Sequence, residues 1–282
     1  MKKIYLIMIC VIWGISLLGC NVTEGIDIVE ESTDTLAESV EDTIQDTENI
    51  SVDEEYSEVA ISGIEGANPK HVIIDFSLVN EKYAEGTEVK PYELKMVDEG
   101  KIDVMNADEW YIQKNLSLPM LGNEWNHFSD EEYEYRWVGS ALEIYEKETD
   151  NCLYSIEYPT DKWYVNGNNA YLKDGIFYGG CIANGYAQPN SCFLFAYDLD
   201  KEEILWRSAD QTYNTMNFVV KEDIIICGYG FTDENDYLYQ INRNTGEVIE
   251  QMELKKMPDL IVEQDGKLYV HTYSYDYTIE FE

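Results

Sequence analysis

FLFAYDLDKEEILWR, residues Phe193 to Arg207, is the stretch of sequence that decides the fold. Phe193, Phe195 and Tyr197 alternate with other residues along its first half, and this period of two predicts a β-strand. The polar run DKEE that follows is typical of a turn, and ILW begins a second strand. The stretch therefore predicts a β-hairpin.

Weaker copies of this hairpin lie on both sides of it. The residue in the place of Ala196 is Ile144 in the copy 52 residues earlier and Gln240 in the copy 44 residues later. Further strand pairs recur ahead of these hairpins and near the C-terminus, at Asn169–Tyr178, Asn217–Ile226 and Asp259–Val270. Two hairpins make a unit of four short antiparallel strands in about 45 residues, which is the size of a propeller blade. Such blades bury their faces against one another around an axis.

The hairpin copies also resemble a known repeat. Ala196, Asp198 and Trp206, together with Thr245-Gly246 in the turn of the next copy, are similar to the quinoprotein-type (PQQ-like) propeller signature A-x-D-x-x-T-G-x-x-x-W. The resemblance covers roughly residues 132–282 and implies a propeller in which the tryptophan docks between blades. No copy is complete. In the copy that contains Ala196, for example, Lys201-Glu202 stands where Thr-Gly belongs.

The resemblance does not extend to a cofactor. None of the basic and metal-ligating residues that hold the cofactor in quinoprotein dehydrogenases can be placed on this chain, so we expect no cofactor and no catalytic or metal site. An unrelated β-meander or sandwich is the alternative fold.

We therefore expect an all-β domain at residues 69–282, a small or incomplete propeller of about five four-stranded blades. The clearest repeats span 141–282, and 69–140 is a degenerate blade or a cap, with strands at 89–96, 102–105 and 109–113. The final unit ends at its third strand, Tyr277–Phe281, and His71–Phe76 could add beside it to close the ring.

The N-terminus predicts export and lipid attachment. Two lysines precede a largely apolar run, Ile4–Leu18, which is shorter than the ~20 residues of a spanning helix and typical of a signal peptide. The run ends in Leu17-Leu18-Gly19-Cys20, which resembles the bacterial lipobox, in which the cysteine is diacylglycerylated and residues 1–19 are removed. The sequence thus predicts a lipoprotein anchored through Cys20 at the extracytoplasmic face of the cell membrane.

An acidic segment, residues 20–68, follows the anchor. Asn21–Asn68 holds 15 Asp and Glu residues and no Lys or Arg. It contains too little apolar surface to offset the entropy of ordering, so we expect a disordered stalk. The whole chain carries a formal charge of −37, which makes nucleic acid a poor partner.

Four cysteines lie beyond the export segment. Cys181 and Cys192 flank one loop of a predicted hairpin, where they could form a disulfide in an exported protein or be two small buried residues. Cys152 and Cys227 fall in predicted inner strands and are expected in the core. No CxxC spacing and no common catalytic motif occurs, and the three histidines share no motif.

These observations favour a non-catalytic binding or scaffold module with a protein or glycan partner. One alternative is an extracytoplasmic enzyme acting on glycans or cell-wall peptides, which would need convergent carboxylates of perturbed pKa. Another is a solute-binding lipoprotein with a closed pocket. The 23 tyrosines and six tryptophans fit either packing between blades or a ligand-binding face.

Overall fold

The fold is described from a computed structural model, for residues 68–75, 81–102, 107–117, 127–157, 163–164, 170–183, 191–231 and 235–282. All of them belong to one compact unit, Ser62–Glu282. The expected signal peptide, Cys20 and nearly all of the acidic segment lie outside the described residues.

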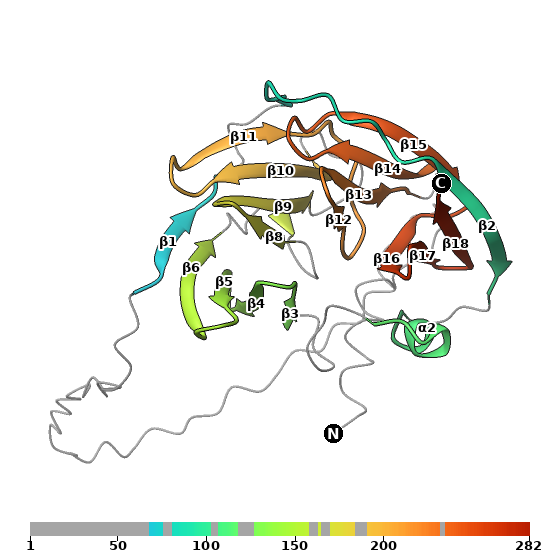
Figure 1. The fold of residues 1–282 in the computed structure, drawn as a ribbon, viewed down its shortest axis with the longest axis horizontal. Helices are drawn as coiled ribbons and strands as arrows, with labels where there is room; N and C mark the ends of the chain where they lie inside the picture. Colours follow the sequence, from blue (N-terminus) through green and yellow to red (C-terminus); the bar gives the residue numbers. More distant parts are fainter. Residues whose placement is uncertain are drawn as a thin grey trace, which may run out of the picture. The chain divides into compact units, whose positions relative to one another are not determined.

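The described strands form four small sheets, called blades 1 to 4 in chain order (Figure 1). Blade 1 has the order β1-β6-β5-β4-β3, with β1 (Lys70–Ile73), β3 (His127–Ser129), β4 (Tyr133–Val138), β5 (Ala141–Glu146) and β6 (Asn151–Glu157). Blade 2 has the order β11-β10-β9-β7, with β8 also beside β9; its strands are β7 (Trp163–Tyr164), β8 (Ala170–Lys173), β9 (Ile176–Ala183), β10 (Phe193–Asp198) and β11 (Glu203–Arg207).

The other two blades have four strands each. Blade 3 has the order β12-β13-β14-β15, with β12 (Val219–Lys221), β13 (Ile224–Tyr229), β14 (Asp236–Asn242) and β15 (Val248–Leu254). Blade 4 has the order β16-β17-β18-β2, with β16 (Pro258–Gln264), β17 (Lys267–Thr272), β18 (Tyr275–Phe281) and β2 (Leu94–Lys101). The predicted all-β propeller is confirmed, and the described residues form four blades where the sequence suggested about five.

The repeat positions read from the sequence are equivalent in the structure. A shift in the strand register follows Ile144 in blade 1, Ala196 in blade 2 and Gln240 in blade 3, which are the three aligned positions. Six residues after each of them the backbone is left-handed, at Asp150, Glu202 and Gly246, with φ of 55°, 56° and 83°. The turn that carries Thr-Gly in the complete signature therefore keeps its shape even where the glycine is missing.

Neighbouring blades share apolar cores. Ile144 packs in one cluster with Phe195 between blades 1 and 2, and Trp206 with Ile241 between blades 2 and 3. A third cluster joins Ile226 and other blade 3 residues to Ile279 and its neighbours in blade 4. These side chains are nearly fully buried, so burial of apolar surface between blades is the main stabilising contribution.

Blade 4 is completed by an N-terminal strand, but by a different segment from the one predicted. β1, which overlaps the expected closing segment His71–Phe76, pairs in parallel with β6 of blade 1. β2 is the strand that adds beside β18, antiparallel, with Met96 opposite Ile279. The apolar residues Leu94 and Met96 pack on the blade 4 core, which favours this pairing.

Residues 81–93, ahead of β2, run along the outer edges of the blades (Figure 1). Lys82 pairs through its backbone with Arg207 of blade 2, and the Ala84 amide donates to the Thr245 carbonyl of blade 3 at 3.1 Å. We call residues 81–93 the strap. It supplies hydrogen-bond partners to strand edges that would otherwise be unpaired.

A helix, α2 (Ala107–Lys114), covers the other face of blade 4 where the sequence predicted a strand at 109–113. Its Trp110 is 2% exposed and stacks on His271 of β17, with ring centroids 5.1 Å apart. Lys114 pairs with Asp276 at 2.6 Å. The strand prediction was wrong because this segment covers a blade face and does not extend a sheet edge.

Candidate functional site

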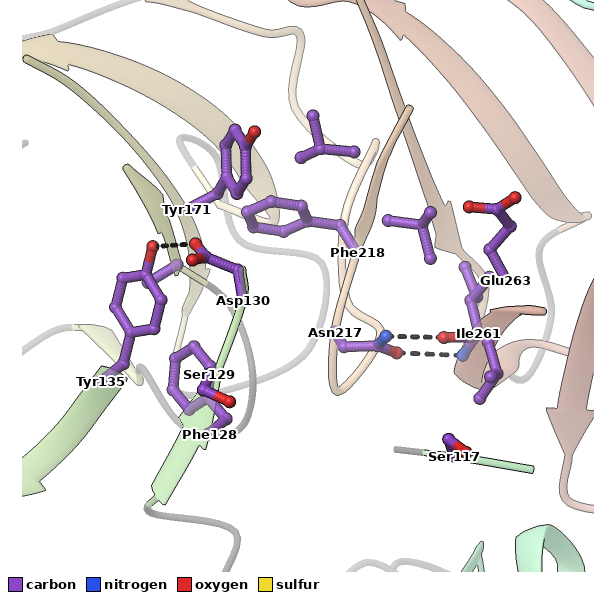
Figure 2. A pocket seen from close by; sticks show the side chains of 14 residues that line it. Ser117, Phe128, Ser129, Asp130, Tyr135, Tyr171, Asn217, Phe218, Ile261 and Glu263 are labelled. Atoms are coloured by element: carbon purple, nitrogen blue, oxygen red, sulfur yellow. Dashed lines mark hydrogen bonds between the residues drawn. The ribbon is translucent and has the colours of Figure 1, made fainter. Parts of the chain in front are cut away.

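A cavity of ≈ 400 Å³ lies where the innermost strands of the four blades meet (Figure 2). Its walls come from β3, β8, β12 and β16 and the residues beside them, so each blade contributes. Four aromatic side chains line it: Phe128, Tyr135, Tyr171 and Phe218. The remainder of the wall is half aliphatic and half polar, and its polar part comes from Ser117, Ser129, Asp130, Asn217 and Glu263. A concave, largely apolar wall with a few polar groups is the usual character of a ligand site.

Blades 3 and 4 are joined at this cavity by a side-chain amide. Asn217 Nδ2 donates to the Ile261 carbonyl at 2.6 Å, and the Ile261 amide donates to Asn217 Oδ1 at 2.9 Å. Figure 2 shows this pair of bonds spanning from one inner strand to the next. Asn217 is 3% exposed, so both of its bonds form away from water and hold the wall in place.

Blades 1 and 2 are joined by Tyr135. Its hydroxyl donates to Asp130 Oδ2 at 2.5 Å and accepts from the Leu172 amide at 2.9 Å. Burial, together with the neighbouring Asp130 carboxylate, raises the pKa of Tyr135 well above its usual value. The phenol therefore stays neutral at physiological pH and serves as a hydrogen-bond donor.

A second cavity of ≈ 550 Å³ continues from the first and is acidic. The two share Asp130, Tyr171, Val220 and Glu263 as lining residues. Glu131, Glu132 and Lys173 complete most of the remaining wall. One end of the combined space is thus aromatic and the other is rich in carboxylates.

Two of these carboxylates form ion pairs. Glu132 pairs with Lys173 at 2.6 Å, and Glu263 pairs with Lys221 at 2.8 Å. Asp130 accepts hydrogen bonds at Oδ1 from the Glu132 and Tyr133 amides, so its carboxylate is fixed by the turn in which it lies.

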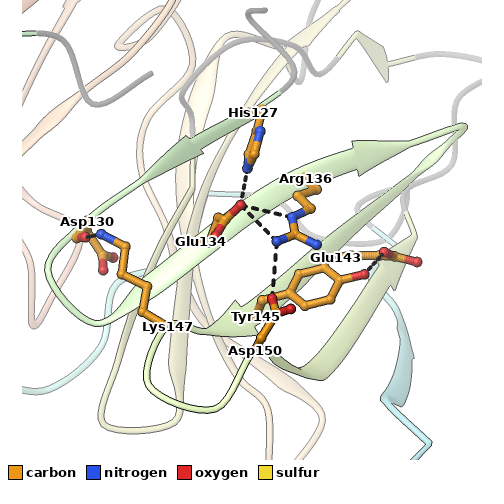
Figure 3. Close-up of polar contacts among 8 residues, drawn as sticks. All are labelled: His127, Asp130, Glu134, Arg136, Glu143, Tyr145, Lys147 and Asp150. Atoms are coloured by element: carbon orange, nitrogen blue, oxygen red, sulfur yellow. Dashed lines mark hydrogen bonds and ion pairs between the residues drawn. The ribbon is translucent and has the colours of Figure 1, made fainter. Parts of the chain in front are cut away.

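A separate polar cluster lies on β3, β4 and β5 of blade 1 and the turn that follows (Figure 3). Glu134 contacts His127 Nε2 and accepts from Arg136 Nε at 3.0 Å. Burial raises the pKa of Glu134, but hydrogen bonds from His127 and Arg136 outweigh it and hold this pKa below its usual value. Arg136 also lies 3.9 Å above the Tyr145 ring and pairs with Asp150. These residues are bound to one another and line neither cavity, which fits a structural ion-pair network.

The cysteines singled out in the sequence lie in two places. Cys181 is fully buried on β9, and Cys192 comes directly before Phe193, the residue that pairs with Cys181 in the ladder. The structure contains no bond between the two sulfur atoms, so the disulfide stays a prediction. Cys227 is buried in the core between blades 2 and 3, whereas Cys152 is only partly buried.

The cavity residues were not identified from the sequence, although the repeat contains a signal for them. In blades 2, 3 and 4 the wall is formed by the residues just before the first hairpin turn of each unit, which begins at Asp174, Glu222 and Asp265. Tyr171, Val219 and Val262 stand three residues ahead of these three turns. Aligning the inner strands by their turns would have placed these residues around a common axis.

Within the described parts of the chain, no group of three or more His, Cys, Asp or Glu residues could hold a metal ion. In the same residues no helix has the length and apolar character needed to cross a membrane.

No known protein family model matches the chain, and no curated protein sequence matches it. Among solved structures, it is similar to BamB from Moraxella catarrhalis, with 10% identity over 58% of this chain and 61% of that one, at a TM-score of 0.33. It is also similar to a europium-containing methanol dehydrogenase, with 11% identity over 57% of this chain and 27% of that one, at 0.32. It is also similar to the computationally designed Ika4 protein, with 9% identity over 59% of this chain and 97% of that one, at a TM-score of 0.37. The chain thus spans less than two thirds of the length of the two natural proteins.

Proposed function

We propose that the chain is an exported lipoprotein, anchored through Cys20 at the extracytoplasmic face of the cell membrane, and that its propeller is a non-catalytic binding module. The observation that carries the binding role is the cavity to which the inner strands of all four blades contribute. The anchor rests on the run from Ile4 to Cys20 and on the acidic segment that follows.

The polar groups of the cavity favour binding over catalysis. Tyr135 and Asp130 bond to each other, and Asn217 bonds to the backbone of the next blade, so these groups hold the walls together. Glu263 is engaged by Lys221. A general acid or base needs a proton to give to or take from a substrate, whereas these groups are already committed to the fold.

The binding role can be tested with the full chain in detergent. Thermal unfolding is measured with panels of glycans, cell-wall peptides and small solutes, and the same mixtures are analysed for products by mass spectrometry. We expect at least one compound to raise the unfolding temperature with no product formed. Release of a product would instead favour an enzyme acting on glycans or wall peptides.

Cavity-filling variants assign the binding to this site. Val220→Trp fills the region shared by the two cavities, and Ser129→Phe fills it from blade 1. Val248→Trp, on the exposed edge strand β15, is the control for added bulk. Both filling variants should abolish the stabilisation by the compound and the control should keep it. Unchanged stabilisation in a folded filling variant would place the ligand elsewhere.

The anchor is tested separately by substitution of Cys20. The wild-type chain should fractionate with membranes at a mass lacking residues 1–19 and carrying acyl chains. Cys20→Ser should accumulate as the unprocessed form. Processing and acylation that persist in Cys20→Ser would contradict the lipid anchor.

A further inference from the structure

We propose that the combined cavity binds an organic cation, whose apolar part lies among the aromatic residues and whose positive group lies at the carboxylates. This inference rests on the proposed binding function and adds the chemical class of its ligand. It is carried by the continuity of two cavities with opposite character, which share the lining residues Asp130, Tyr171, Val220 and Glu263.

The aromatic half suits the apolar part of such a ligand. Phe128, Tyr171 and Phe218 come from three different blades and surround the space shown in Figure 2. Phe128 and Phe218 are 3% and 8% exposed, so their positions are fixed by packing. Contact with an alkyl group would remove apolar surface from water, which stabilises binding, and aromatic faces also attract cations.

The acidic half carries more negative than positive charge. Its wall holds the four carboxylates of Asp130, Glu131, Glu132 and Glu263 against the one ammonium of Lys173. Lys221 pairs with Glu263, and Lys147 bonds to the backbone oxygen of Asp130, so two further ammonium groups lie close by. In the part of the chain that the structure describes, no ion pair engages the carboxylates of Asp130 or Glu131.

The excess of carboxylates favours a positively charged ligand over a negatively charged one. An anion would approach several carboxylates, two of them without an ion-pair partner, and would lose its own hydration without compensation. A cation replaces its hydration with attraction to carboxylates in a recess where the effective dielectric constant is lower than in water. The overall charge of −37 also concentrates cations near the chain.

Three probes built on a six-carbon chain separate charge from apolar contact: hexyltrimethylammonium, hexanol and hexanoate. Each is titrated into the full chain by isothermal calorimetry in low salt and in 0.5 M NaCl, where charge interactions at a partly open site are largely screened. We expect the cation to bind about tenfold or more tightly than hexanol in low salt, and hexanoate to bind least. High salt should remove most of the advantage of the cation.

Two matched substitutions test the acidic half. Glu131→Gln should weaken the cation about three- to tenfold and leave hexanol unchanged, since one carboxylate is lost and no ion pair is broken. Glu253→Gln is the control, because Glu253 is exposed on β15, lines neither cavity and forms no ion pair in the described part of the chain. Val220→Trp should abolish binding of both probes.

Several outcomes would overturn the inference. Binding of hexanoate or hexanol as tightly as the cation would show that charge plays no role in recognition. Equal effects of Glu131→Gln and Glu253→Gln would show the same. If no alkyl probe binds while another compound still stabilises the chain and loses this effect in Val220→Trp, the cation inference fails and the binding function stands. If no compound of any class binds, both fail.

Discussion

Trp206 of blade 2 lies directly against Gly246 in the turn of blade 3. A Cβ atom on Gly246 would be 2.6 Å from Cε3 of the indole, and the indole Nε1 donates to the Arg243 carbonyl at 2.9 Å. The tryptophan of one repeat is therefore held by the Thr-Gly turn of the next. This is the docking between blades that the quinoprotein-type resemblance implies.

Substitution of Gly246 by Ala should destabilise the propeller for two reasons. Its φ of +83° disfavours any side chain, at a cost of about 1–2 kcal/mol, and the new methyl would displace Trp206 from its contact. We expect a loss of about 2–4 kcal/mol in the free energy of unfolding, measured with urea.

Gly266→Ala is the matched control for this experiment. Gly266 has a similar φ of +73°, but no atom lies within 4 Å of its would-be Cβ. Only the backbone cost of about 1–2 kcal/mol should appear there. Equal losses at both glycines would show that the contact with Trp206 contributes nothing.

Gln240 fastens the strap to blade 3. Its side-chain amide donates to the Tyr92 carbonyl and accepts from the Tyr92 amide, both at 2.9 Å, and Gln240 is 1% exposed. Gln240→Leu would leave both backbone groups without their partner at a cost of about 2–3 kcal/mol in the free energy of unfolding.

Hydrogen exchange locates the effect of this substitution. Exchange of the backbone amides of residues 81–93 should accelerate in Gln240→Leu, because the strap would open before the blades do. Gln251→Leu, at an exposed position of β15, is the control. It should change the free energy of unfolding by no more than about 0.5 kcal/mol and leave amide exchange in the strap unchanged. Unchanged exchange in the strap would mean that Gln240 does not hold it.

The repeating part of the fold could be predicted from the sequence because its signals are local. The alternation in Phe193–Asp198 and the recurring turns define hairpins, and the left-handed residues Asp150, Glu202 and Gly246 recur at one position of the unit. Where each unit has its own hairpins, stacking against the next unit follows from the need to bury both faces.

The strap, the closing strand and the cavity could not be predicted, since they depend on contacts distant in sequence. Tyr92 meets Gln240 across 148 residues, and β2 joins β18 although other segments have comparable strand character. The sequence around Trp110 also alternates weakly, and it becomes a helix because it covers a blade face. The cavity combines residues from four units, so only an alignment of the inner strands by their turns would bring them together.

The predicted disulfide between Cys181 and Cys192 can be tested directly. Burial raises the pKa of the Cys181 thiol, so little thiolate is present and the reduced form should react slowly with iodoacetamide. After export or mild oxidation, non-reducing peptide mass spectrometry should find the two cysteines in one linked peptide pair. Cys227, whose thiol pKa burial also raises, is the internal control for a buried cysteine and should remain free. Two free thiols after oxidation would contradict the predicted disulfide.

Asp259 makes the stability of the domain depend on pH. Desolvation raises the pKa of this carboxyl from about 4 to about 6, and in the described residues no basic side chain forms an ion pair with it. Below pH 4 the carboxyl is protonated in both the folded and the unfolded chain and costs nothing. As the pH rises to 6 the unfolded chain ionises first, so the folded state loses stability, and above pH 6 the loss is complete.

Asp259→Asn removes this titration and should therefore stabilise the protein only at higher pH. We expect a gain of about 1–3 kcal/mol in the free energy of unfolding at pH 8, falling to near zero at pH 4, from urea titrations at both values. Asp265→Asn, at an exposed turn whose left-handed backbone Asn tolerates, is the control for loss of one negative charge. Because both variants relieve the general repulsion within an acidic chain equally, the difference between them isolates the desolvated carboxyl of Asp259. A gain that is the same in the two variants, or that is larger at pH 4 than at pH 8, would show that Asp259 is not ionised at a cost in the folded state.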